Sequence, residues 1–231
     1  MSAATVESIE PNAATVCARP VPVADQERVI PEEYLRRERL AEFRSEYRDG
    51  EIVARDGEIV AMAGASLAHI RIDANLMGEL VSQLKGKPCE PMGSDAKIRA
   101  TRMRYSYPDV TIVCGEPEFL DEQRDVITNP TVLFEILSPS TEAYDRGEKF
   151  AAYQQRPTLR DYVLVAQDKV SVEHYSRQDE NGGVWRYERL DRPDAVLRLP
   201  SVGCEVLLSD IYARVNFPEP EPILGETTNE D

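Results

Sequence analysis

The segments SYPDVTIVC (residues 106–114) and TVLFEILSPSTEAYDRGEKF (131–150) give the clearest indication of the architecture. Each begins with a run rich in β-branched residues, which predicts a strand. Asp109 opens the first strand, and Glu135 lies in the middle of the second. The sequence YDRGEKFAAYQQR (144–156) then predicts a helix. Strands and helices alternate along the rest of the chain, which indicates an α/β fold.

Further predicted elements extend this pattern in both directions. A helix is expected over 31–46, because Pro31 suits a first helical turn and acids follow it. Ser66 is expected to cap a longer helix that ends before Gly86. Apolar residues recur along it at helical spacing: Ile70, Met77, Leu80, Val81 and Leu84. Further strands are predicted over 95–100, 161–167, 169–177, 184–190 and 195–200, with a turn at 181–183 and a short helix over 208–215.

The composition along the chain predicts a single α/β domain over residues 29–216, because no linker-like stretch interrupts residues 30–215. Residues 1–28 lack hydrophobic periodicity and are expected to form a disordered leader. Residues 217–231 are acidic and proline-rich and are expected to form a disordered tail.

The seven-residue phrase RDGEIVA occurs twice in tandem, at 48–54 and 55–61. Each copy contains Asp-Gly, a strong signal for a two-residue hairpin turn. Turns at both pairs predict a three-stranded meander whose oily face carries Tyr47, Ile52, Ala54 and Ile59. We interpret the repeat as scaffold rather than as a catalytic loop, because Asp-Gly is first of all a turn signal.

The composition also limits the compartment and the class of metal. No apolar run approaches the roughly 20 residues of a membrane span, and the N-terminus lacks the features of a secretory signal. The four cysteines are scattered, which is more typical of a reducing cytoplasm than of a disulfide framework. With two histidines, a histidine-based zinc site is disfavoured, and oxygen ligands favour magnesium, manganese or calcium.

The net charge of −15 argues against a broad nucleic-acid-binding surface, because affinity for phosphate backbones comes largely from Lys and Arg. This charge leaves room for a small basic cleft.

Asp109 and Glu135 are the sharpest candidates for chemistry. A carboxylate inside an apolar strand is costly unless it is paired, hydrogen-bonded or bound to a metal. Two carboxylates on neighbouring strands can bind one divalent ion, with an intervening backbone carbonyl as a third oxygen. Lys149 on the following helix could point its ammonium at a metal-bound water or a phosphate. Together these groups suit metal-assisted phosphodiester hydrolysis.

Each of these residues also has a structural interpretation. Asp109 could be held by backbone donors after Pro108, Glu135 could pair with Arg104 in a buried ion pair, and Lys149 could be a solvated partner of Asp145. A second set of residues has supporting roles in the catalytic hypothesis, with capping, exposure or helix packing as alternatives: His69, Asp73, Ser138, Asp145 and Tyr153. Ser138 has no histidine or lysine at triad spacing, which disfavours a serine hydrolase.

Four segments resemble the Uma2 family of restriction endonucleases, a branch of the PD-(D/E)XK nuclease superfamily. They are EYRDGEIVAMAGAS, read across one copy of the repeat, YPDVTIVCGEPEF, NPTVLFEILSPSTEAYDRGEKFAAYQQ and LRDYVLVAQDKVSVEHY. The resemblance covers roughly residues 30–215. It implies a restriction-endonuclease-like core, a mixed four-stranded sheet flanked by helices, with an extra N-terminal hairpin or meander and extra C-terminal strands.

The resemblance also implies a cytoplasmic endonuclease that depends on Mg²⁺ (or Mn²⁺) and acts on nucleic acid, on DNA in preference to RNA, with no membrane partner. Asp109, Glu135 and the backbone carbonyl of Ile136 are then the metal ligands. Leu137 stands where the family motif has its lysine, so Lys149 is expected to supply that ammonium from the next helix. Two alternatives stay open: a catalytically inactive binding module of the same fold, and an interaction protein that forms a homodimer through its sheet edge.

Overall fold

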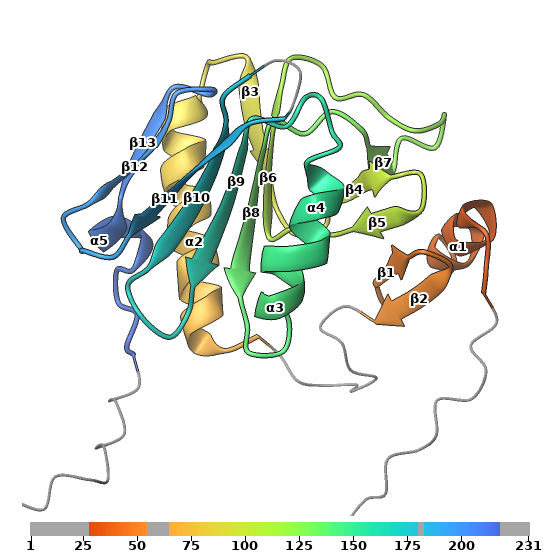
Figure 1. The fold of residues 1–231 in the computed structure, drawn as a ribbon, viewed down its shortest axis with the longest axis horizontal. Helices are drawn as coiled ribbons and strands as arrows, with labels where there is room; N and C mark the ends of the chain where they lie inside the picture. The colour runs from red at the N-terminus through yellow and green to blue at the C-terminus, as the bar shows by residue number, and fades with distance from the viewer. Residues whose placement is uncertain (1–27, 55–64, 180–182, 218–231) are drawn as a thin grey trace, which may run out of the picture.

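Two β-sheets of different size carry the fold in the computed structural model, which describes residues 28–54, 65–179 and 183–217 (Figure 1). The larger sheet has the order β11-β10-β9-β8-β6-β3. Its strands are β3 (Cys89–Met92), β6 (Val110–Cys114), β8 (Val132–Leu137), β9 (Asp161–Ala166), β10 (Val172–Arg177) and β11 (Trp185–Leu190). β8 runs parallel to β9, whereas β6 and β10 are antiparallel to their neighbours. The expected mixed sheet of an α/β nuclease-like fold is confirmed, with more strands than the four expected.

The second sheet lies beside the first and has the order β2-β1-β5-β4-β7. Its strands are β1 (Ser45–Arg48), β2 (Glu51–Ala54), β4 (Lys97–Thr101), β5 (Arg104–Ser106) and β7 (Val126–Ile127). A separate hairpin joins β12 (Val196–Leu199) to β13 (Cys204–Leu207). The chain crosses from the second sheet to the first between β5 and β6, at Tyr107, Pro108 and Asp109. The sequence predicted one element across this point, and it is split because proline has no N–H to donate to a ladder.

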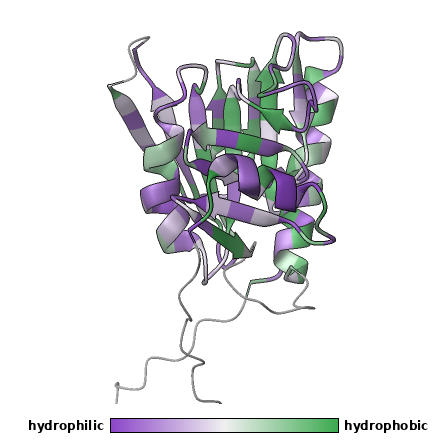
Figure 2. Ribbon diagram, turned by 90° about the vertical axis from the view of Figure 1, so that its right-hand side faces the viewer, coloured by the Kyte–Doolittle hydropathy of each residue, from purple (hydrophilic) through white to green (hydrophobic). Residues whose placement is uncertain are grey.

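The helices are α1 (Pro31–Glu38), α2 (Leu67–Leu84), α3 (Glu142–Tyr144), the π-helical turn η1 (Asp145–Lys149), α4 (Phe150–Tyr153) and α5 (Leu208–Ile211). Helices lie on both faces of the larger sheet, whereas α1 packs against the second sheet (Figure 1). α2 and α5 pack with the β12–β13 hairpin against one face, and α4 packs with the second sheet against the other. The apolar residues concentrate on the central strands between these layers (Figure 2). Helix α1 is shorter than the expected 31–46, because β1 begins at Ser45.

Helix α2 begins as predicted, with the Ser66 hydroxyl accepting a hydrogen bond from the His69 N–H. Its buried face consists of Ile72, Leu76, Leu80 and Leu84. Ile70 and Val81, which also recur at helical spacing, are 53% and 50% exposed and lie off this face. The reason is that apolar residues occur on two sides of this helix, and spacing alone does not say which stripe faces the sheet.

The first turn of the repeated phrase is confirmed. β1 and β2 pair antiparallel, with Arg48 opposite Glu51 and Tyr47 opposite Ile52. Asp49 and Gly50 both have positive φ, at 50° and 104°, as a two-residue hairpin turn of this kind requires. Asp56-Gly57 and Ile59 lie outside the described residues, as does most of the turn expected at 181–183. The other edge of β1 pairs with β5, which fixes the hairpin within the second sheet.

Two cysteines contradict the expectation of unpaired thiols. Cys89 on β3 lies directly opposite Cys114 on β6, and the two form a disulfide. β3 was not predicted because CEPM is short and contains a proline, so no pattern in the sequence indicated that the two cysteines face each other. Cys204 is a buried free thiol. In the described part of the chain, no helix has the length and apolar character needed to cross a membrane.

Candidate active site

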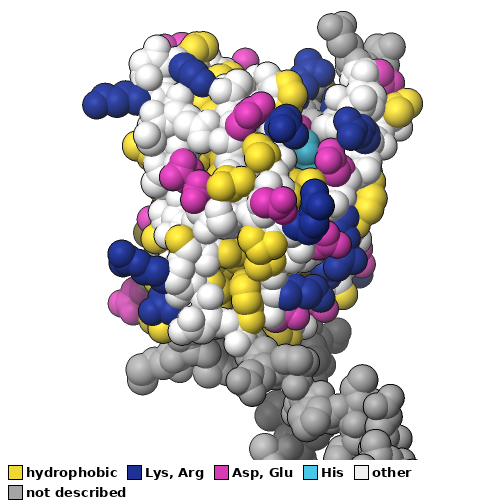
Figure 3. Space-filling model, turned by 90° about the vertical axis from the view of Figure 1, so that its left-hand side faces the viewer, with side chains coloured by type: hydrophobic (Ala, Val, Ile, Leu, Met, Phe, Trp, Pro, Cys, Tyr) yellow, Lys and Arg dark blue, Asp and Glu magenta, His cyan; other side chains and the backbone are white. Residues whose placement is uncertain are grey.

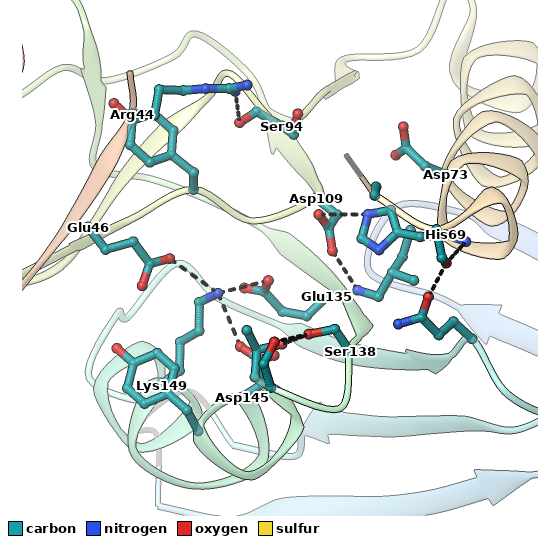
Figure 4. Close-up of a pocket in the computed structure, with 18 of the residues that line it drawn as sticks. Arg44, Glu46, His69, Asp73, Ser94, Asp109, Glu135, Ser138, Asp145 and Lys149 are labelled. Carbon is teal, nitrogen blue, oxygen red and sulfur yellow. Dashed lines mark hydrogen bonds and ion pairs between the residues drawn. The ribbon is translucent and has the colours of Figure 1, made fainter. Parts of the chain in front are cut away.

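A cavity of about 580 Å³ opens where the two sheets meet the first turn of α2 and the turn η1 (Figure 4). Asp109, Glu135, Ile136 and Lys149 all line it. The predicted supporting residues His69, Asp73, Ser138 and Asp145 line it as well. Tyr153 lies one turn beyond Lys149, and its hydroxyl donates a hydrogen bond to Glu135. The structure therefore brings together every residue that the sequence singled out.

Asp109 stands just before β6, where the chain leaves the second sheet. Its backbone N–H donates to the carbonyl of Phe134 (3.1 Å), which extends the β6–β8 ladder by one residue. Its Oδ2 accepts a hydrogen bond of 2.6 Å from the N–H of Ile136, so the backbone-donor interpretation describes part of its role. Its Oδ1 lies 3.4 Å from Nε2 of His69. Asp109 is thus fixed by one neighbouring strand and faces the cavity near the start of α2.

Glu135 and Lys149 form the central ion pair of the cavity. The Nζ of Lys149 lies 2.9 Å from Oε2 of Glu135, 3.2 Å from Oδ1 of Asp145 and 3.5 Å from Oε1 of Glu46. Lys149 is 6% exposed, so the interpretation of a solvated helix residue is wrong. Arg104 pairs instead with Asp49 and Glu148, so the alternative Arg104–Glu135 pair is also wrong.

The charges in this cluster do not balance. Burial opposes the charge of Lys149, but Glu135, Glu46 and Asp145 raise its pKa well above the ordinary value, so the ammonium stays protonated. For Glu135, burial and then the neighbouring Asp145 and Asp109 raise the pKa well above its usual range, although Lys149 acts in the other direction. Lys149 is shared among Glu135, Asp145 and Glu46, of which Glu46 also pairs with Arg48. An additional cation would relieve this imbalance.

The helix after β8 explains how Lys149 reaches a site whose usual lysine position holds Leu137. Side chains alternate along β8, so Glu135 and Leu137 point to the same side of the sheet. Leu137 is buried in the core that includes Phe150 and Tyr153 of α4. Lys149 ends the π-helical turn η1 on that same side. Single π-helical turns inside α-helices are frequent at functional sites.

The supporting residues have distinct positions. The hydroxyl of Tyr153 donates to Oε1 of Glu135 (3.3 Å) and lies 2.7 Å from Oγ of Ser106, so this buried tyrosine does more than pack the helix. Oγ of Ser138 lies within 3.0 Å of the hydroxyls of Ser140 and Thr141 at the start of α3. Asp145 contacts Lys149 and offers its carbonyl to the hydroxyl of Tyr162.

Sequence reasoning missed the wall of the cavity that the second sheet provides. Glu46, Arg48 and Arg44 line it, together with Ser94 and Tyr107. Nη1 of Arg44 donates to the carbonyl of Ser94 (2.8 Å) and also contacts Asp95. The one available signal was the segment EYRDGEIVAMAGAS, which contains Glu46 and Arg48. The spacing of these two residues does not by itself indicate a catalytic or binding site.

The oxygen donors suit a magnesium or manganese ion. Asp109 and Glu135 lie on adjacent strands, since Val110 pairs with Phe134. Among the described residues, no group of three His, Cys, Asp or Glu side chains is arranged to hold an ion. Mg²⁺ is usually bound by one or two carboxylates and keeps several waters, so two carboxylates and a carbonyl match its coordination preference. The raised pKa of Glu135 is consistent with a position that accepts a cation.

Comparisons with known proteins identify the family of this chain. The sequence model of the Uma2 family, described as "putative restriction endonuclease", matches residues 31–209. A Synechocystis sp. protein described as "uncharacterized protein slr1290" is 36% identical over 200 residues, covering 85% of this chain and 97% of its own length. A second, "uncharacterized protein sll1609", is 36% identical over 146 residues, covering 63% of this chain and 78% of its own.

A solved structure shows the same fold. The crystal structure of a protein from Anabaena variabilis, described as a putative nuclease belonging to DUF820, superposes with a TM-score of 0.62 at 19% identity. The superposition covers 80% of this chain and 97% of that one.

Proposed function

This chain belongs to the Uma2 family, and on that premise we propose that it is a divalent-metal-dependent endonuclease that hydrolyses phosphodiester bonds, with DNA as its substrate. The observation that carries the proposal is the 2.9 Å contact between Lys149 and Glu135 beside Asp109. Two acids and a lysine at one site are the groups that this hydrolysis needs. Leu137 at the usual lysine position therefore does not remove the ammonium from the site.

Each residue has a stated role in the proposed reaction. Asp109, Glu135 and the carbonyl of Ile136 would hold Mg²⁺ or Mn²⁺, which when bound supplies a Lewis acid and an oriented water. The Ile136 N–H and His69 keep the carboxylate of Asp109 in place. The hydroxyl of Tyr153 orients Glu135 from the opposite side. The ammonium of Lys149 stabilises the negative charge that develops on the phosphate oxygens.

The distribution of charge bears on how the protein would meet DNA. On the face shown in Figure 3, basic and acidic side chains lie among one another and between hydrophobic groups. The cavity presents the cations Arg44, Arg48 and Lys149 together with five acids, Glu46, Asp73, Asp109, Glu135 and Asp145. We therefore infer that a phosphate of the substrate is bound in this cavity only with the divalent ion, whose charge would offset the acids. The cytoplasm is where such a substrate lies, whereas the Cys89–Cys114 disulfide is an observation against that compartment.

A plasmid-nicking assay tests the proposal. Supercoiled DNA is incubated with the full chain and Mg²⁺, Mn²⁺ or EDTA, and single-stranded DNA and RNA serve as parallel substrates. Metal-dependent nicking by the parent, lost in Asp109→Asn and kept in the exposed control Asp168→Asn, is the expected result. Equal nicking by parent and Asp109→Asn would contradict the proposed role of Asp109.

A second candidate function is a catalytically inactive interaction module that dimerises through its sheet edge. It is favoured by β11, an edge strand with Tyr187 52% exposed and Val184 just before it 56% exposed, and by the net charge of −15. Light scattering distinguishes it: a dimer that Tyr187→Glu converts to a monomer supports the module.

A further inference from the structure

Glu46 contacts the proposed catalytic lysine although it comes from the second sheet. It lies on β1 and is 3% exposed. Its Oε1 is 3.5 Å from Nζ of Lys149, and its Oε2 is 2.8 Å from Nη2 of Arg48. The two oxygens of one buried carboxylate are thus divided between two cations (Figure 4 shows the lysine contact).

Arg48 is itself held against the helical segment that carries Lys149. Its guanidinium carbon lies 3.5 Å from the centroid of the Tyr144 ring, a stacked cation–π contact. Tyr144 is the last residue of α3 and directly precedes η1. Strand β1 therefore contacts this segment at two points, at Tyr144 through Arg48 and at Lys149 through Glu46.

Lys149 needs a second partner because its backbone lies on the helical turn η1, whereas its ammonium must stay beside Glu135 on β8. A lysine side chain is a flexible four-carbon stem with rotatable donors, and it loses much rotamer freedom when it is fixed. Asp145 lies on the same turn as Lys149 and draws the ammonium back toward its own helix. Glu46 reaches it from the second sheet, so Glu135 and Glu46 together counter that pull. Burial opposes the ionisation of Glu46, but Lys149 and Arg48 lower its pKa below the ordinary value, so its charge is retained.

We propose that Glu46 is the positioning residue for Lys149: its carboxylate, oriented by Arg48 on Tyr144, holds the ammonium beside Glu135. Arg48 is the first residue of the repeated phrase, so the first copy contributes this one residue to the positioning of Lys149. The kinetic consequence rests on the proposed nuclease function, whereas the placement of the ammonium does not.

The placement is tested on the metal-free full chain. Lysine-selective NMR measures hydrogen exchange of the Lys149 ammonium, assigned by its loss in Lys149→Met. We expect a slowly exchanging signal in the parent, exchange at least about tenfold faster in Glu46→Gln, and no change in Glu51→Gln. Glu51 is the matched control, because it is an exposed acid opposite Arg48 on the same hairpin. An unprotected ammonium in the parent, or equal exchange in parent and Glu46→Gln, overturns the proposal.

The kinetic arm uses DNA cleavage by the metal-loaded protein. Glu46→Gln is expected to lower kcat by about 10- to 100-fold, as loss of an orienting partner usually does, with KM changed by no more than about twofold. Arg48→Gln should lower kcat in the same direction by less. If Glu46→Gln fails to fold, the ammonium exchange of Lys149 in Arg48→Gln carries the test, because the Arg48 side chain is 25% exposed but also lines the cavity; exchange equal to that of the parent then overturns the proposal. A loss confined to KM would place Glu46 among the substrate contacts and overturn the proposal. If the parent cleaves neither DNA nor RNA, the nuclease proposal fails and the ammonium exchange still decides the placement.

Discussion

The ammonium of Lys149 lies 2.9 Å from the carboxylate of Glu135, although the lysine belongs to the helix that follows the strand of the glutamate. In the PD-(D/E)XK motif the two groups are neighbours on one strand. Here Leu137 occupies that strand position and is packed into the core. The ammonium thus lies beside the glutamate as in the motif, but it comes from the following helix instead of the same strand. Its position therefore depends on how that helix is fixed against the two sheets.

Replacing the lysine tests its part in catalysis. Lys149→Met is expected to lower the cleavage rate by about 10²-fold or more, since it removes the cation that faces the developing charge. It should also destabilise the fold by about 3–5 kcal/mol at neutral pH, because several buried acids lose their partner. Cleavage kinetics and chemical denaturation measure the two effects.

Lys169→Met is the matched control, because the Lys169 side chain is 60% exposed and its ion pair, at 3.9 Å, is with the exposed Asp168. Full activity in Lys149→Met would place the catalytic cation elsewhere. Arg146 and Lys97 would be the next candidates, although neither is among the residues that line the cavity.

Metal binding should stabilise the protein. An ion present at 100 times its Kd contributes about 2.7 kcal/mol, which corresponds to roughly 5–10 °C in Tm for a domain of this size. We expect Mn²⁺ to raise the Tm of the parent and to leave Asp109→Asn unchanged. The asparagine keeps an acceptor for the Ile136 N–H, so the variant should fold. An equal rise in both proteins contradicts a site at Asp109 and Glu135.

The strands that carry Asp109 and Glu135 could be predicted from the sequence because their signals are local. Asp109 follows a proline at the start of an apolar strand, and Glu135 interrupts another, so burial and proximity follow from strand pairing. The wall formed by Glu46 and Arg48 could not be predicted in this way. Which sheet β1 joins is decided by its pairing with β5, and nothing in the β1 sequence encodes that partner.

Two further differences have the same kind of cause. The outward positions of Ile70 and Val81 follow from which stripe of α2 meets the sheet, and this is a tertiary choice. The Cys89–Cys114 disulfide depends on the register of an edge strand that lacks a strong strand signal. Local sequence patterns predicted the helices and strands. Contacts between segments distant in the sequence determined which face of each is buried and which strand it pairs with.

Glu46 gives the stability an acid-dependent component. Its pKa is lowered in the folded protein, despite burial, by Lys149 and Arg48. A lowered pKa means that its stabilisation is present above the ordinary value of 4.5 and is lost as the pH falls through the folded pKa. The difference in unfolding free energy between the parent and Glu46→Gln should therefore shrink below about pH 4.5. A difference that stays constant from pH 7 to pH 3 would mean that Glu46 is not preferentially ionised in the fold.

The disulfide should stabilise the edge of the larger sheet. Cys89 and Cys114 are separated by 25 positions, and closing a loop of that length is worth about 3 kcal/mol in the chain-entropy account. Reduction, or the double substitution Cys89→Ala and Cys114→Ala, should lower the Tm by roughly 10 °C. Cys204→Ala is the control. Mass spectrometry of the alkylated, unreduced protein that finds both thiols free would contradict the pairing.

The tandem phrase offers the last test. Because its two copies are identical, deleting Arg55–Ala61 leaves Ser45–Ala54 unchanged and joins Ala54 to Met62. The β1–β2 hairpin then keeps Glu46, Arg48 and the Asp49-Gly50 turn, which are the parts that reach the cavity. The connection to Ala65 shortens to Met62, Ala63 and Gly64, which span at most about 14 Å when extended.

We expect the shortened protein to fold, with a Tm within a few degrees of the parent, and to bind Mn²⁺ with the same affinity in a calorimetric titration. The physical reason is that, among the described residues, the repeated phrase lines the cavity through Arg48 of its first copy, and the deletion leaves that residue and its hairpin in place. A deletion protein that is folded but no longer binds Mn²⁺ would show that the second copy also belongs to the site. One that is unfolded would show that the shortened connection cannot bridge β2 to α2, and the second copy would then be a spacer that the fold requires.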